Sequence, residues 1–278
     1  MKKILGIILS VIIMTAVLAS CSGGVSNEII VVSREDGSGT RGAFTELMGI
    51  EIDGTDNTTE EATFVNSTSV VMATVAGNEQ SIGYISLGSL DDTIKALSVD
   101  GAEATVENIQ NDSYPVYRNF NIATKGEVSE AAQDFIDYIL SDEGQAVVEE
   151  AGFISIDSTG TFNGGDVSGK VVVGGSTSVA PVMEKLQEAY NVLNPNVEIE
   201  VHLGGSGTGM QQTMDGTLDI GMASRELKDS EKAELDGIVI AIDGIAVVVN
   251  NNNLIDNLTS EQIRQIFTGE ITTWNMFD

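Results

Sequence analysis

The stretch VVVGGSTSVAPVMEKLQEAY, residues 171–190, sets a pattern that the rest of the chain repeats. Three consecutive valines predict a buried strand, and the Gly/Ser/Thr segment after them predicts a loop. Downstream, Val179, Met183, Leu186 and Tyr190 recur at the spacing that places apolar side chains on one face of a helix. The first turn of such a helix offers unpaired N–H groups and a positive dipole end, which together suit an anion.

Two further segments repeat this strand–loop–helix pattern. The loop GGSGTG (204–209) follows the alternating strand 197–203, and the loop REDGSGT (34–40) follows the apolar strand 29–32. Serine or threonine at such a position can also be a plain N-cap, so one loop alone identifies no ligand. Three such loops in one chain favour a shared ligand, and the alternation of strands and helices indicates an α/β fold.

Other segments predict structural elements without a ligand-binding role. Residues 129–150 predict a pair of helices, and residues 259–267 predict a capped helix that Gly269 ends. The nearly all-apolar run 238–250 suits a strand buried on both faces that crosses between two lobes. Residues 155–170 are rich in Gly, Ser, Thr and Asp and predict a tether.

The first residues predict export. Residues 1–20 have two lysines, an apolar run and then small residues, which is typical of a signal peptide rather than a membrane span. The segment LASC (18–21) resembles the lipobox of bacterial lipoproteins, which implies lipidation of Cys21, a linker over 21–26 and an extracytoplasmic location anchored to the cell membrane. The alternative is a cysteine that merely follows a signal peptide. Cys21 is the only cysteine, so no disulfide forms within the chain.

Composition excludes several classes of function. The formal charge is −29, with 42 acidic against 13 basic residues, so nucleic acid and anionic lipid headgroups are not expected partners. His202 is the only histidine, which rules out a multi-histidine metal site and any triad on another histidine; we interpret it as a plain strand residue. GGDVSGK (164–170) lacks the Ser/Thr and the following helix of a phosphate loop, and GGSGTG fails the G-x-S-x-G pattern. No metal and no cofactor are expected.

Six motifs together carry a resemblance to a known family: GSTSVAPVMEKL, GGSGTG, DIGMASREL, IDGIAVVVN, QIRQIFTGEITTWN and VVSREDGSGTRGAF. They resemble the phosphate-binding proteins of bacterial ABC phosphate importers, and the resemblance runs from about residue 27 to 278. It implies a two-lobed, type II-like periplasmic-binding-protein fold with the ligand in the cleft between the lobes. It also implies a monomer without enzymatic activity that binds inorganic phosphate and delivers it to a membrane permease and its ATPase.

The order of the motifs differs from the usual order of that family. Its members begin at the GSTSVAP-like loop and end after the equivalent of EEAGFI, whereas this chain begins at the third loop and crosses the tether to the usual beginning. We interpret this as a circular permutation, with a misassembled gene as the alternative, and expect Asp278 to lie near Asn27. One lobe is expected over 114–244, tether included, and the other over 27–113 together with 245–278.

Residue by residue, the resemblance implies a phosphate site shared between the lobes. One lobe would supply Arg34, Ser38, Gly39 and Thr40, and the other Thr177, Ser178, Ser206 and Ser224. Asp36 would hold the Arg34 guanidinium, although an Asp before glycine can also simply form a turn. Many relatives have aspartate at the position of Ser224, where it accepts the proton that phosphate retains and sulfate lacks; here Ser224, Asp243 or Asp36 would have to accept it.

Other functions stay open on the sequence alone. The site could hold another tetrahedral oxyanion such as sulfate. A serine hydrolase or phosphatase could use Ser38 or Ser206, although no histidine lies near either in sequence. A surface protein for adhesion or phosphate sensing could share the site without transport.

Overall fold

The computed structural model describes residues 27–277. The expected signal peptide (1–20), the linker (21–26) and the lipidation of Cys21 lie outside the described residues. Within residues 27–277 no helix combines the length and apolar character needed to cross a membrane.

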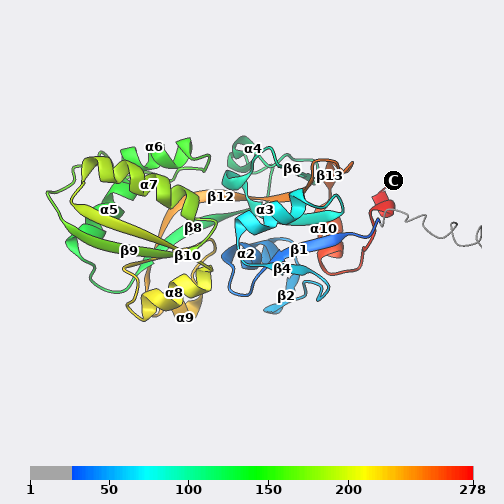
Figure 1. The fold of residues 1–278 in the computed structure, drawn as a ribbon, viewed down its shortest axis with the longest axis horizontal. Helices are drawn as coiled ribbons and strands as arrows, with labels where there is room; N and C mark the ends of the chain where they lie inside the picture. The colour runs from blue at the N-terminus through cyan, green and yellow to red at the C-terminus, as the bar shows by residue number, and fades with distance from the viewer. Residues whose placement is uncertain (1–26, 278) are drawn as a thin grey trace, which may run out of the picture.

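One mixed sheet runs through both lobes of the molecule (Figure 1). Its strand order is β10-β9-β11-β8-β12-β5-β1-β4, and β6 pairs with β12. The bounds are β10 Val197–Gly204, β9 Gly169–Ser176, β11 Ile220–Ala223, β8 Tyr117–Thr124, β12 Asp236–Asn250, β5 Ser81–Ser86, β1 Ile30–Arg34, β4 Thr63–Val65 and β6 Ile94–Ala96. Two small ladders lie apart from it: β2 Glu51–Ile52 with β3 Thr55–Asp56, and β7 Ser98–Val99 with β13 Asn257–Leu258.

Strand β12 connects the two lobes. Its first part, residues 236–244, pairs antiparallel with β8, and its last part, residues 245–249, pairs antiparallel with β5. Residues 240–250 are buried apart from Ile242, which explains why this segment is almost entirely apolar. The prediction of a buried strand that crosses between lobes is therefore confirmed.

The lobe at the left of Figure 1 packs its helices on β8–β11. These helices are α5 Glu130–Leu140, α6 Asp142–Glu150, α7 Ala180–Leu193, α8 Ser206–Met214 and α9 Asp229–Lys232. The predicted helix pair is confirmed as α5 and α6, with Ser141 capping α6 through its side chain. Residues between 120 and 241 form the main core of this lobe.

The second lobe is built from the two ends of the described chain. Its helices are α2 Gly39–Leu47, α3 Thr68–Ala76, α4 Val106–Gln110 and α10 Ser260–Phe267, with 3₁₀ turns η1 Leu87–Ser89 and η2 Trp274–Phe277. Phe44 stacks on Tyr84 at 4.0 Å between ring centroids, and Phe267 meets Phe44 edge-on at 4.9 Å. Helix α10 begins at a capping box on Thr259, and Gly269 follows it with φ of 79°, as predicted.

The two ends of the described chain lie side by side. The Trp274 N–H donates to the Asn27 carbonyl at 2.9 Å, and the Asn27 side chain donates to Asn275 at 2.5 Å. The expected proximity of the chain ends is confirmed for these residues, while Asp278 lies outside the described part. In the other lobe the tether packs on α5 and α6, because Glu143 accepts the Phe162 N–H at 2.8 Å and Asp134 accepts the Gly165 N–H at 2.9 Å.

Candidate anion-binding site

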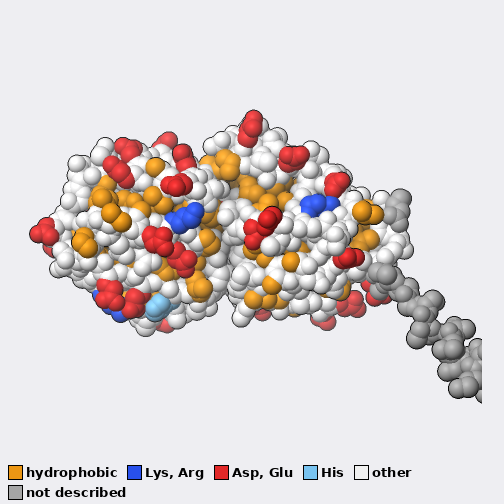
Figure 2. Space-filling model, turned by 45° about the horizontal axis from the view of Figure 1, so that its top comes forward, with side chains coloured by type: hydrophobic (Ala, Val, Ile, Leu, Met, Phe, Trp, Pro, Cys, Tyr) orange, Lys and Arg blue, Asp and Glu red, His pale blue; other side chains and the backbone are white. Residues whose placement is uncertain are grey.

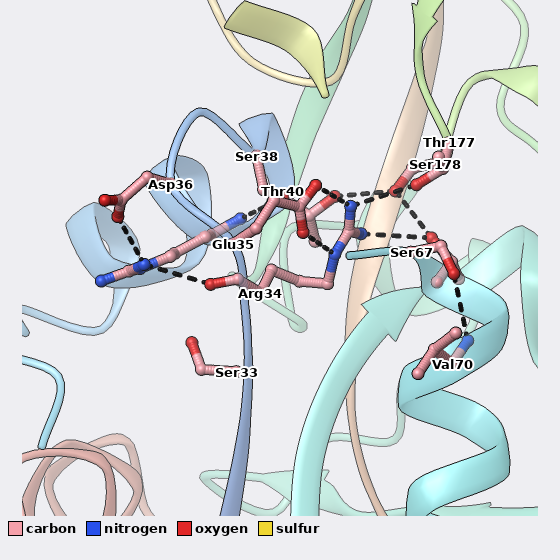
Figure 3. Close-up of polar contacts among 12 residues, drawn as sticks. Ser33, Arg34, Glu35, Asp36, Ser38, Thr40, Ser67, Val70, Thr177 and Ser178 are labelled. Carbon is pink, nitrogen blue, oxygen red and sulfur yellow. Dashed lines mark hydrogen bonds and ion pairs between the residues drawn. The ribbon is translucent and has the colours of Figure 1, made fainter. Parts of the chain in front are cut away.

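The three predicted strand–loop–helix units bring their loops together between the lobes. Strand β1 leads into α2, β9 into α7 and β10 into α8, and each helix starts within a few residues of its strand. The end of β11 adds Ser224 to the same place. Figure 3 shows the side chains of Arg34, Thr40, Thr177 and Ser178 turned toward one another from the two lobes.

The Arg34 guanidinium is buried and held from both lobes; only 2% of the residue is exposed. Its Nε and Nη2 donate to the two carboxylate oxygens of Glu35 at 2.7 and 2.8 Å. Nη2 also donates to Thr177 Oγ1 at 3.1 Å, and Nη1 donates to Thr68 Oγ1 at 3.4 Å. Because Thr177 and Thr68 belong to different lobes, this cation bridges the cleft.

The predicted role of Asp36 is wrong. Its side chain is 99% exposed and pairs with Arg41, whose Nη1 lies 2.8 Å from Asp36 Oδ1. Arg41 stands in the first turn of α2 and also donates to the backbone carbonyl of Arg34 at 3.1 Å, which places its guanidinium beside Asp36. The carboxylate that holds the Arg34 guanidinium is that of Glu35, the residue directly after it.

Hydroxyl groups from both lobes form a buried cluster next to Arg34. Thr40 Oγ1 lies 2.8 Å from Ser178 Oγ and 3.3 Å from Ser224 Oγ. Ser206 Oγ accepts the backbone N–H of Ser224 at 3.1 Å, and Ser176 Oγ donates to Ser224 Oγ at 2.9 Å. Each of these five residues is at most 3% exposed, so the cluster is shielded from bulk water. Ser176 was not among the predicted residues.

Helix starts frame the cluster. The hydroxyl of Ser38 caps α2 by accepting the Arg41 N–H at 3.3 Å, while Gly39 is the first residue of that helix. A Cβ added at Gly39 would lie 2.4 Å from Ser206 Oγ and 2.7 Å from Ser224 Oγ, so only glycine allows the lobes to approach this closely. The Gly207 N–H donates to the Gly37 carbonyl at 2.9 Å and joins the lobes directly. All eight predicted ligand residues therefore lie in or beside one interlobe cluster.

Sequence reasoning missed a second buried arginine at the cleft. Arg118 on β8 stands opposite Asp243 on β12 in the antiparallel register, with Nη2 3.1 Å from Asp243 Oδ2. Asp243 Oδ1 accepts the Ser86 hydroxyl at 2.9 Å and the Gly88 N–H at 3.3 Å. Burial raises the pKa of Asp243 to about 6, although the Arg118 charge and these hydrogen bonds act in the opposite direction. No local signal reveals the pair, because 125 residues separate its members.

His202, interpreted as a plain strand residue, plays no part in this cluster. His202 lies on β10 as predicted, with 57% of its side chain exposed, and pairs with Glu200 at 3.5 Å. The only histidine of the chain thus stands on the surface. Among residues 27–277, no group of three or more His, Cys, Asp or Glu side chains is arranged to hold a metal ion.

Comparisons with known proteins identify relatives of this chain. The profile of the PBP superfamily domain matches residues 16–143 and 160–277. The phosphate-binding protein PstS 2 of Streptococcus agalactiae serotype V is 49% identical over 270 residues, which cover 93% of this chain and 92% of that protein. The crystal structure of a phosphate-binding protein of a phosphate ABC transporter from Streptococcus pneumoniae TIGR4 is 45% identical, with a TM-score of 0.71, and the match covers 90% of this chain and 100% of that one.

The matches also bear on the order of the segments. The Streptococcus agalactiae protein aligns with nearly the whole chain, so this order is shared and is not a misassembly of one gene. The phosphate-binding protein PstS of Staphylococcus saprophyticus, at 37% identity, aligns over only 123 residues, or 41% of this chain and 39% of that protein. A partial match of this kind is what a permuted order predicts, because one alignment can follow only one of the exchanged segments.

Proposed function

The chain belongs to the PBP superfamily, and from that premise we propose that it binds inorganic phosphate outside the cytoplasm and delivers it to the permease of an ABC importer. One observation carries the proposal. A buried guanidinium, five hydroxyl-bearing side chains and the starts of helices α2, α7 and α8 converge from both lobes on one small region. The names of the streptococcal relatives, which are phosphate-binding proteins, support phosphate as the anion.

The chemistry of these groups suits a dehydrated tetrahedral anion. The Nη1 and Nη2 groups of Arg34 that face Thr68 and Thr177 can donate to the anion, and hydroxyls together with helix N–H groups add further donors around it. A hydrogen bond to a charged partner contributes about 1.5–3 kcal/mol, so a few of them reach the roughly 8 kcal/mol of a micromolar complex. Binding of the anion between the lobes would favour their closed arrangement, as in other hinged binding proteins.

The acidic surface does not prevent anion binding at this site. Figure 2 shows carboxylates spread over both lobes with few lysines or arginines among them, in keeping with the net charge of −29. Charges more than about 8–10 Å apart in solvent are largely screened at physiological salt. The buried cluster contains hydrogen-bond donors, and these determine the affinity for the anion. The acidic surface affects the rate at which the anion associates.

We infer that Glu35 makes the site selective for phosphate over sulfate. Asp36 faces solvent, and the described contacts of Asp243 are with Arg118, Ser86 and the Gly88 backbone rather than with the hydroxyl cluster. Glu35 is the carboxylate in contact with the Arg34 guanidinium. A protonated phosphate oxygen can donate to this carboxylate, whereas sulfate has no proton and would face a fixed negative charge.

Transport and membrane attachment complete the proposal. A lipid on Cys21 would hold the protein at the outer side of the cell membrane, and a monomer would present both lobes to the permease. Transport differs from sensing or adhesion in a measurable way. Deletion of the gene should abolish high-affinity uptake of radiolabelled phosphate, and re-expression of the intact protein should restore it; unchanged uptake would favour sensing.

Titration calorimetry tests the site directly. The wild-type protein should bind phosphate more tightly than sulfate, and Arg34→Ala should weaken phosphate binding at least 100-fold, since it leaves the Glu35 carboxylate without its partner. Arg264→Gln is the matched control because Arg264, on α10, forms its ion pairs with Glu261 and Glu270, which lie outside the cluster. Glu35→Gln should raise the sulfate-to-phosphate affinity ratio at least fivefold. Undiminished phosphate binding by Arg34→Ala would show that the site is wrong.

A further inference from the structure

Arg118 contacts both lobes at the point where the chain crosses between them. Its Nη2 donates to Thr40 Oγ1 at 3.1 Å, and its Nε donates to the Ser224 carbonyl at 3.1 Å. Its Nη1 donates to the Gly244 carbonyl at 3.4 Å. Thr40 belongs to the first turn of α2 in one lobe, whereas Ser224 follows β11 in the other. One side chain therefore touches two members of the hydroxyl cluster and the crossing strand.

The Asp243 carboxylate fixes where the Arg118 guanidinium can lie. Asp243 is itself anchored by the Ser86 hydroxyl and the Gly88 N–H. The side chains of Arg118 and Asp243 are 4% and 1% exposed, so neither can turn into water without opening the cleft. A continuous series of contacts thus runs from Ser86 through Asp243 and Arg118 to Thr40.

The contact with Arg118 determines what the Thr40 hydroxyl can do. A threonine hydroxyl has one proton and two acceptor lone pairs. Arg118 has no acceptor, so it always donates to Thr40, and one lone pair of Thr40 is occupied. The Thr40 proton then points away from Arg118, toward the cluster that holds Ser178 and Ser224.

We propose that Arg118 is a positioning residue for anion binding. Arg118 orients the Thr40 hydroxyl so that it donates to the bound anion, and it does this only when the two lobes are closed. This inference rests on the proposed phosphate site. Arg118 does not itself have to touch the anion, because it acts through Thr40 and through the Ser224 carbonyl.

The charges near the cluster fit this role. Burial lowers the pKa of Arg118, the Asp243 charge raises it, and the positive charge of Arg34 lowers it further. Two guanidinium groups therefore lie close enough to repel each other, and each has its own carboxylate, Glu35 for Arg34 and Asp243 for Arg118. An anion bound beside them relieves part of this repulsion, which strengthens binding in the closed arrangement.

A double-mutant cycle on the full chain tests the proposal by calorimetry with inorganic phosphate. Arg118→Gln alone should weaken phosphate binding about tenfold, which corresponds to about 1.4 kcal/mol. In the Thr40→Val background the same change should weaken it less than twofold, because the hydroxyl that Arg118 positions is gone. Arg264→Gln should leave the affinity within twofold of the wild type.

A purely structural role predicts a different outcome. Arg118→Gln leaves Asp243 buried without its ion-pair partner, which destabilises the fold. The double variant Arg118→Gln/Asp243→Asn removes both charges and should recover most of the lost melting temperature while phosphate affinity stays about tenfold low. Recovery of affinity together with stability would overturn the proposal, as would equal losses with and without the Thr40 hydroxyl. Absence of phosphate binding by the wild type would instead refute the proposed function on which the inference rests.

Discussion

Gly39→Ala offers a direct test of the closed interlobe geometry. The new methyl group would lie 2.4 Å from Ser206 Oγ, 2.7 Å from Ser224 Oγ and 3.0 Å from the Ser224 carbonyl carbon. All three atoms belong to the opposite lobe, so the closed arrangement cannot form without a shift of the lobes. Overpacking of this kind costs about 1–3 kcal/mol, which corresponds to phosphate binding about 5- to 150-fold weaker.

The same substitution should not destabilise the fold of its own lobe. Gly39 is the first residue of α2, and its φ is not among the positive values of the chain, so alanine fits the backbone there. Alanine favours a helix over glycine by up to about 1 kcal/mol. Gly39→Ala should therefore weaken phosphate binding while its melting temperature stays unchanged or rises. A decrease of both the affinity and the melting temperature would indicate misfolding.

Gly42→Ala is the matched control for this prediction. Gly42 lies on the same helix, and a Cβ there meets only Arg225 Cδ, at 3.9 Å, which is an ordinary contact. Calorimetry with phosphate should find Gly42→Ala within twofold of the wild type and Gly39→Ala at least fivefold weaker. Thermal melts without phosphate should place both variants at or above the wild type. Wild-type affinity in Gly39→Ala would refute the tight approach of the two lobes around the anion.

Three further outcomes are expected. Asp36→Asn should change phosphate affinity less than twofold, because this side chain is 99% exposed and pairs with Arg41; a tenfold loss in calorimetry would restore it as a site residue. Asp134→Ala should lower the free energy of unfolding by about 3 kcal/mol in urea titrations without changing phosphate affinity, since it leaves Tyr190, Asn194 and the Gly165 N–H of the tether without their acceptor. Burial raises the pKa of Asp243 to about 6, above its ordinary value of 3.8. Between these two pH values the folded state retains a proton on Asp243 that the unfolded state releases. The stability that this proton contributes is therefore present below pH 4 and is lost as pH rises through about 6. Asp243→Asn does not titrate, so its free energy of unfolding relative to wild type should rise by about 2 kcal/mol between pH 4 and pH 7, and a difference independent of pH would contradict this.

The local parts of this structure could be predicted from the sequence. A strand of valines, a Gly/Ser/Thr loop and an apolar face at helical spacing lie within about 20 residues at β9 and α7, so periodicity and loop composition suffice to find the unit. The same holds for the capping box on Thr259 and for the helix that it begins.

The partners of the two buried arginines could not be predicted in the same way. Glu35 and Asp36 are adjacent acids, and which of them faces Arg34 depends on the turn before Gly37, whose φ is 81°, and on Arg41 binding the other one. Arg118 and Asp243 meet only because β8 and β12 pair antiparallel in one particular register. A register error of a single residue would place them on opposite faces of the sheet, and no local pattern fixes it.

The unusual order of the segments leaves the cleft intact for a structural reason. The ends of the described chain meet at η2 and the start of β1, at the end of their lobe that lies far from the other lobe in Figure 1. The tether packs on α5 and α6 of the other lobe and supplies none of the cluster residues. Strand β12, which crosses between the lobes, is continuous, and so is each loop with its helix. Hinge and site thus keep their covalent connections under either order, so closure around an anion should depend on Gly39, Arg34 and Arg118 rather than on where the chain begins.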